Sequence, residues 1–242
     1  GASFFKVTNE FAKNINYSKL PNYKLVILND LKNISSGLSA ELRQYALNGG
    51  NILVFPAADA DLNSYKLFLN SLNCNELSNY ETANREVSSI NLDAALFNDV
   101  FETKKTNLKL PSTQGNYKIL GGRGEEKLMT YRDGYTFITQ VRQDKGNLYV
   151  CAAPLEESKN TLVKNGEIFV PMLFKMAITN NVKQHLAYII GKDDIIEENL
   201  ELKEGESAEK NYIIKGEKGE FIPQQKMLGS KMIIGINQQI KE

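Results

Sequence analysis

Residues 23–56, YKLVILNDLKNISSGLSAELRQYALNGGNILVFP, predict one complete strand–helix–strand unit. Lys24–Asn29 is a short run rich in Val, Ile and Leu, which favours a strand buried on both faces. Apolar side chains then recur at helical spacing from Leu38 to Ala46, and Gly49-Gly50 supplies the expected helix stop. Asn51–Pro56 predicts a second strand, which a right-handed crossover makes parallel to the first. This unit therefore predicts an open, mostly parallel α/β sheet.

Later strands are expected to extend that sheet in the antiparallel sense. Asp133-Gly134 separates the β-prone runs Lys127–Tyr131 and Tyr135–Val141, which is typical of a tight hairpin. A second turn sequence, Asp144–Gly146, leads into Asn147–Cys151 in the same way. The pattern predicts an antiparallel meander beside the parallel strands.

The two ends of the chain have weaker patterns. Residues 6–11 (KVTNEF) alternate loosely between apolar and polar, which predicts a further strand. Apolar residues from Ile168 onward predict a helix that accepts Pro171 in its first turn. Beyond residue 180, short apolar runs alternate with Gly, Lys and Glu turns, so residues 181–242 predict a small β-sandwich-like domain. Because this domain is small for independent stability, we expect it either to pack on residues 1–180 or to lack a strand.

The composition excludes several classes of function. Of the 242 residues, Lys and Arg number 29 and so do Asp and Glu, with no basic stripe, so nucleic acid is not expected as a partner. His185 is the only histidine, which excludes a metal site built on several imidazoles. Cys74 and Cys151 lack metal-ligand spacing and are interpreted as buried apolar residues. The longest apolar stretch, Ile168–Ile178, is shorter than the roughly 20 residues of a membrane span.

Catalysis of the amidotransferase kind needs a nucleophilic Cys on a sharp strand-to-helix turn and a downstream His. The turn after the second strand, Pro56–Asp59, contains neither Cys nor Ser. Cys151 ends a strand but lacks the glycines of such a turn, and His185 lies past the first domain. The G-x-S-x-G motif is also absent. We therefore predict that the chain is not an enzyme.

Acidic side chains follow both strands of the first unit. Asn29 and Asp30 close the first strand, and Asp59 and Asp61 follow the second, so all four are expected at one edge of the sheet. Their oxygens suit a hard cation such as Mg²⁺ or Ca²⁺, or a small polar ligand. The competing interpretation is that they are loop and helix-cap residues, which are far commoner than metal sites. We predict a ligand-binding edge at these four residues, with no bound metal and no cofactor.

Several segments together resemble a known family. They are LVILNDL (25–31), the helix leading into NGGNILVFP (48–56), LPS (110–112), GNLYVCAAPL (146–155) and FVPMLFKMA (169–177). They resemble the soluble, glutamine-amidotransferase-like region of bacterial membrane proteins of the aerotolerance BatA type. The resemblance covers roughly residues 1 to 180. It implies a flavodoxin-like domain that has lost its nucleophile and its catalytic triad, placed outside the cytoplasmic membrane.

The expectation for function follows from this resemblance. We expect a non-catalytic, extracytoplasmic interaction domain of a bacterial envelope protein that is anchored in the cell membrane by segments outside these residues. The domain would face the periplasm, and its partners would be other envelope or membrane proteins. The alternative is a small-molecule, sugar or metal-binding module, or a hydrolase, that uses the acidic edge at Asn29, Asp30, Asp59 and Asp61.

Overall fold

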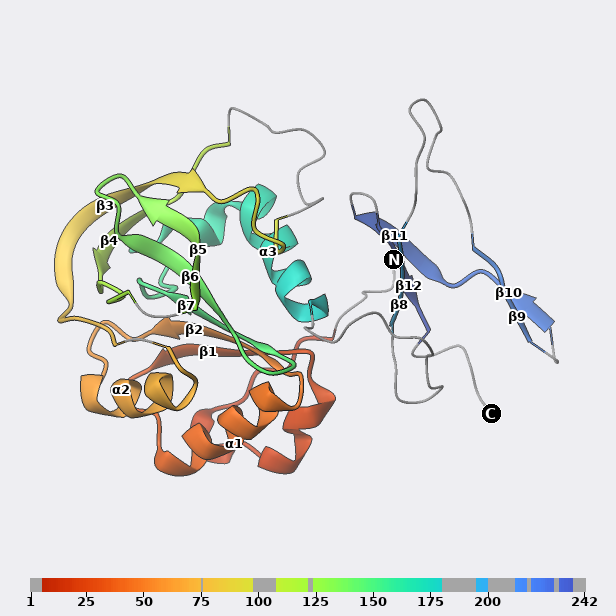
Figure 1. Cartoon of the computed structure of the whole chain (residues 1–242), viewed down its shortest axis with the longest axis horizontal. Coiled ribbons are helices and arrows are strands. Elements are labelled where there is room, and N and C mark those ends of the chain that lie inside the picture. Colours follow the sequence, from red (N-terminus) through yellow and green to blue (C-terminus); the bar gives the residue numbers. More distant parts are fainter. Residues whose placement is uncertain are drawn as a thin grey trace. The chain divides into compact units, whose positions relative to one another are not determined.

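The computed structural model describes residues 6–74, 76–97, 108–121, 124–179, 195–199, 212–216, 219–228 and 231–236. The chain divides into two compact units (Figure 1). The larger unit holds the described residues from Glu10 to Thr179, and the smaller unit holds the strands from Ile195 onward. The predicted boundary between residues 180 and 181 lies outside the described residues and stays a prediction; His185 lies outside them as well.

A seven-stranded sheet forms the centre of the larger unit, in the order β1-β2-β7-β6-β5-β3-β4. Its strands are β1 (Leu25–Leu31), β2 (Asn51–Pro56), β3 (Glu81–Ile90), β4 (Ser112–Asn116), β5 (Glu125–Tyr131), β6 (Thr136–Arg142) and β7 (Asn147–Cys151). β1, β2 and β7 run parallel, and the other four strands continue the sheet through antiparallel pairs. The prediction of an open, flavodoxin-like α/β sheet with an antiparallel extension is confirmed.

Helices cover both faces of the parallel strands. They are α1 (Ser36–Leu47), α2 (Leu62–Ser71) and α3 (Gly166–Ile178), with short 3₁₀ turns η1 (Ala12–Asn14), η2 (Tyr17–Asn22) and η3 (Thr161–Lys164). α1 and α2 lie on one side of β1 and β2, and α3 lies on the other (Figure 1). Every residue of β2 is buried, which agrees with a strand covered on both faces.

Each α-helix begins at a side chain that accepts a backbone hydrogen bond. The side chain of Ser35 accepts from the Leu38 N–H, that of Asp61 from the Asn63 N–H, and that of Asn165 from the Ile168 N–H. These caps satisfy donors that have no partner inside the helix. The helix starts therefore follow from local sequence.

A buried polar network ties the amino-terminal ends of β2 and β7 to the end of α3. The Asn147 amide donates to Asn51 Oδ1 at 2.9 Å and accepts from Gln140 Nε2 at 2.8 Å. The Asn51 amide in turn donates to the Thr179 carbonyl at 2.8 Å. Asn147 has 0% of its surface exposed, so these bonds replace all contact with water.

The prediction of a strand at residues 6–11 is wrong. These residues form neither a helix nor a strand, and Val7 and Phe11 are 82% and 77% exposed. Alternation alone does not make a strand, because the backbone also needs a neighbouring strand that satisfies its hydrogen bonds.

The smaller unit is all β in its described residues, as predicted. It contains β8 (Ile195–Asn199), β9 (Ile214–Gly216), β10 (Gly219–Phe221), β11 (Gln224–Leu228) and β12 (Lys231–Gly235). β11, β12 and β8 form an antiparallel sheet, and β9 pairs with β10. Met232, Ile234 and Ile236 are its buried apolar centre. Within the described ranges of both units, no helix has the length and apolarity that a membrane span requires.

Candidate functional site

The loops that follow β1 and β2 meet at the carboxyl edge of the parallel strands. Leu31 is in register with Pro56, and the Asp61 N–H donates to the Lys32 carbonyl at 2.7 Å. The Tyr65 hydroxyl donates to the Leu31 carbonyl at 2.6 Å. These bonds fasten the two loops to each other, so the edge is a well-connected part of the fold.

Asp59, one of the predicted site residues, is paired with a lysine. Its Oδ2 lies 2.8 Å from Lys32 Nζ, and both side chains are about 70% exposed. The hydrogen bond from Lys32 lowers the pKa of Asp59, and the same bond raises the pKa of Lys32. The carboxylate is therefore ionised and already balanced by a cation.

The other three predicted residues have different surroundings. Asp61 caps α2 with Oδ1, and its Oδ2 accepts from Asn33 Nδ2 at 3.2 Å. Asp30 has a left-handed backbone (φ 56°) at the point where the β1–β2 register shifts, and both Asp30 and Asn29 are exposed. Among the described residues, no group of three or more His, Cys, Asp and Glu side chains could hold a metal ion. Ligand binding at these four residues stays a prediction.

Tyr117 fixes the loop in which a nucleophile would be expected. Its hydroxyl donates to the Ala57 carbonyl at 2.5 Å and accepts from the Ala60 N–H at 3.2 Å. Tyr117 is 1% exposed, so the bonds are shielded from water. Tyr117 could not be predicted as part of this edge, because it lies 60 residues from Ala57 along the chain and no local pattern links the two.

Cys151 ends β7 and is fully buried. Burial raises the pKa of its thiol to about 12. Because the thiolate is the nucleophilic form of cysteine, this thiol is unreactive near neutral pH. Cys74 is buried as well, which agrees with the interpretation of both cysteines as small apolar residues.

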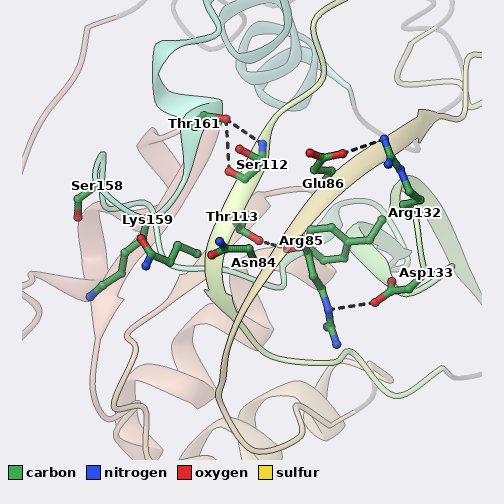
Figure 2. A pocket seen from close by; sticks show the side chains of 12 residues that line it. Asn84, Arg85, Glu86, Ser112, Thr113, Arg132, Asp133, Ser158, Lys159 and Thr161 are labelled. Atoms are coloured by element: carbon green, nitrogen blue, oxygen red, sulfur yellow. Dashed lines mark hydrogen bonds and ion pairs between the residues drawn. The ribbon is translucent and has the colours of Figure 1, made fainter.

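A polar cavity of about 680 Å³ lies elsewhere in the larger unit, against the antiparallel extension (Figure 2). Residues from β3, β4, the end of β5, the β5–β6 turn and the start of η3 with the segment before it line the cavity: Asn84, Arg85, Glu86, Ser112, Thr113, Gln114, Tyr131, Arg132, Asp133, Ser158, Lys159 and Thr161. None of the four predicted site residues is among them. The polar, Asn-rich sequence before Arg85 carries no strand pattern, so β3 and the cavity wall that it builds were not predicted.

Ion pairs balance the charges around the cavity. Arg85 is held by Asp133 (Nε–Oδ2 3.0 Å) and Glu81 (Nη2–Oε2 2.9 Å), and its Nη1 donates to Asn116 Oδ1 at 2.6 Å. Arg132 pairs with Glu86 at 2.8 Å (Figure 2). Lys159 pairs with Glu156 at 2.5 Å. Since these cations already have partners, the cavity offers hydroxyl and amide groups rather than a free charge.

The fold and the site together define a flavodoxin-like α/β domain whose strand-end loops are held by structural contacts. No protein-family model and no curated protein sequence matches the chain. Among solved structures, it is similar to the cytoplasmic protein STM3548 from Salmonella typhimurium, with a TM-score of 0.52 and 9% identity over 67% of this chain and 73% of that one. At this identity, the similarity supports the fold alone.

Two further similarities have lower scores. A ThuA-like protein from Bacteroides uniformis matches with a TM-score of 0.49 and 13% identity, over 71% of this chain and 75% of that one. A β-galactosidase from Rahnella sp. R3 matches with a TM-score of 0.47 and 18% identity, over 68% of this chain and 24% of that one. This chain thus corresponds to about a quarter of the β-galactosidase, and no argument about function rests on either match.

A matched pair of tyrosine variants tests the role of Tyr117. Tyr117→Phe removes the hydroxyl that bonds to both the Ala57 carbonyl and the Ala60 N–H, which then keep only their 3.2 Å bond to each other, so we expect a loss of about 0.5–1.5 kcal/mol in the free energy of unfolding. Tyr149 is also fully buried, but in the described structure its hydroxyl has no hydrogen-bond partner. Tyr149→Phe should therefore leave stability unchanged or raise it by up to about 1 kcal/mol.

Urea unfolding followed by circular dichroism measures both tyrosine variants. Equal losses of unfolding free energy in the two variants would contradict the proposed difference, in which the Tyr117 hydroxyl stabilises a loop and the Tyr149 hydroxyl does not.

Proposed function

We propose that this chain is a non-catalytic interaction domain of a bacterial envelope protein of the BatA type, held on the outer side of the cytoplasmic membrane. The domain binds other envelope or membrane proteins. Its resemblance to the glutamine-amidotransferase-like region of that family supports the location, and the surface of α3 supports the mode of action.

α3 carries the proposal because its outer surface is apolar. Only two of its residues are charged: Glu167 lies in the first turn, and Lys175 is 5% exposed. The apolar α3 face consists of side chains at helical spacing that are exposed or half-buried, namely Val170, Leu173, Phe174 and Ala177, with Val170 60% exposed. A helix at the surface of a domain normally presents polar residues to water. An apolar outer face is typical of a surface that a partner protein covers.

The carboxyl edge of the sheet supports a non-catalytic role. Tyr117 and Tyr65 hold the backbone there, Asp59 is paired with Lys32, and Asp61 caps α2. Two of the four acidic-edge side chains, Asp59 and Asp61, thus have structural partners. The thiol of Cys151 at the end of β7 is buried and protonated.

Site-specific photocrosslinking tests the role of the apolar α3 face. A photoreactive amino acid replaces Val170 in the full-length native protein in living cells, and the matched control places it at Gln44, an exposed position on α1. We expect a discrete crosslinked species from position 170 and none from position 44. A Leu173→Asp substitution should abolish that species. The same products from both positions, or none from either, would contradict the proposal.

The cavity on the antiparallel extension favours a second candidate function, the binding of a neutral polar ligand. Hydroxyl and amide side chains line it and its cations are paired, which suits a sugar better than an anion. A ligand at 100 times its Kd adds about 2.7 kcal/mol of stability, so thermal melts with a panel of sugars would reveal it.

Single substitutions place any stabilising sugar on the molecule. Loss of the shift in Gln114→Ala would locate the ligand in the cavity. Loss in Asp59→Asn or Asp61→Asn would locate it at the acidic edge. No shift with any sugar would contradict this second candidate.

A further inference from the structure

β1 is the last strand of the seven-stranded sheet. It pairs with β2 on its inner side, and within the described residues no strand pairs with its outer side. η2, which precedes β1, packs on α1. The outer edge of β1 therefore presents backbone donors and acceptors that another strand could satisfy.

This edge lacks the features that usually prevent strands from pairing between molecules. Leu25–Asn29 contains no charged residue and no proline, and Ile27 at its centre is 42% exposed. Natural edge strands commonly carry a lysine, a proline or a bulge within the strand. In β1 the register shift occurs only at its end, between Asn29 and Leu31. The central part of the strand is therefore open to pairing.

The charged residues that flank Leu25–Asn29 indicate which kind of partner strand can pair with the outer edge of β1. Lys24 lies three residues before Ile27 and Asp30 lies three residues after it, and both are exposed. In an antiparallel pair of two β1 strands centred on Ile27, Lys24 of each copy lies at the level of Asp30 of the other, just outside the regular part of the pair. A parallel pair in register would instead place like charges side by side, which is unfavourable.

We propose that a second copy of this chain pairs with β1 through an antiparallel β1–β1 contact centred on Ile27. The two copies are related by a twofold axis at Ile27, as in an isologous dimer. Ile27 lies on the face of the sheet that α3 covers, because Asn29 is in register with Phe55 and the Phe55 ring contacts Phe169 of α3. Pairing brings the two Ile27 side chains together on that face and removes their exposed surface from water.

This inference is independent of the proposed function. The partner is a second copy and the surface is a strand edge, whereas the proposed function rests on the apolar α3 face and a different protein. Either can fail while the other stands.

Sedimentation velocity of the 242-residue protein over a range of concentrations tests the dimer. We expect a reversible monomer–dimer equilibrium. Lys24→Asp places two acidic residues opposite each other at both ends of the pair, so the dissociation constant should rise by about tenfold. Adding Asp30→Lys to Lys24→Asp restores opposite charges and should restore the dimer. A monomer at every concentration, or a dimer indifferent to both variants, overturns the proposal.

A second test uses a disulfide and leaves Lys24 and Asp30 unchanged. This avoids the Asp30→Lys substitution, which places a lysine at a position with a left-handed backbone. Directly opposed residues of an antiparallel pair have Cα atoms about 4.5–5.5 Å apart, a separation that a disulfide can span. Ile27→Cys should therefore form a covalent dimer under mild oxidation, and Gln44→Cys should not. The native cysteines are buried and do not interfere. A monomeric Ile27→Cys protein, or equal crosslinking through position 44, would also overturn the proposal.

Discussion

Replacing Gly146 by Ala should destabilise the larger unit by about 3 kcal/mol, near the upper end for an overpacked site. A Cβ atom at this position would lie 2.0 Å from the Gly50 carbonyl oxygen and 2.6 Å from that of Ala46. Both atoms belong to the backbone at the end of α1, so they cannot move aside as a flexible side chain can. The turn between β6 and β7 therefore requires glycine here because of close packing.

Thermal unfolding followed by far-ultraviolet circular dichroism measures this effect, since the described helices all lie in the larger unit. A loss of this size lowers the Tm by about 6–12 °C for a domain of this length. Gly121→Ala is the control, because a Cβ atom there has nothing within 4 Å. The control should change stability by less than about 0.5 kcal/mol. Similar effects from both substitutions would contradict the packing described around Gly146.

Asn147→Leu should cost about 3 kcal/mol or more. The substitution removes the acceptor of Gln140 Nε2 and the donor to Asn51 Oδ1, both in the buried interior. Each buried polar group that is left without a partner costs about 1–3 kcal/mol. The leucine side chain has no donor or acceptor that could replace either bond. The loss also weakens the attachment of α3, because Asn51 holds the Thr179 carbonyl.

Urea denaturation measures the free energy of unfolding of Asn147→Leu and of a control, Asn84→Leu. Asn84 is an exposed strand position of the same sheet. The control should stay within about 0.5 kcal/mol of the unmodified protein. If the two variants unfold at the same urea concentration, the network does not hold the strands as described.

The parts of the fold that depend on neighbouring residues were predictable from the sequence. Helix capping was the competing interpretation of the acidic-edge residues, and Asp61 does cap α2. Asp133-Gly134 was expected to turn between two strands, and Gly134 has the positive φ of 83° that such a turn needs. Both features follow from local preferences of the backbone, which a short stretch of sequence contains in full.

The parts that depend on distant residues were not predictable. Arg85 of β3 contacts Asn116 of β4 and Asp133 of the β5–β6 turn, and Asn51 bonds to Asn147 over a separation of 96 residues. No spacing rule along one chain indicates such a partner. The same limit applies to the candidate site. The sequence pattern predicted that the aspartates lie at one edge of the sheet, but it could not show that Asp59 pairs with Lys32 or that Asp61 caps α2.

Protease accessibility in spheroplasts tests the central proposal, that this domain lies on the outer side of the cytoplasmic membrane of a membrane-anchored protein. The full-length native protein is expressed, and spheroplasts are treated with protease before and after permeabilisation. We predict that the protein fractionates with membranes and that this region is digested in intact spheroplasts, while a cytoplasmic control protein survives. A protein that is found in the soluble fraction, or that is digested only after permeabilisation, would contradict the account.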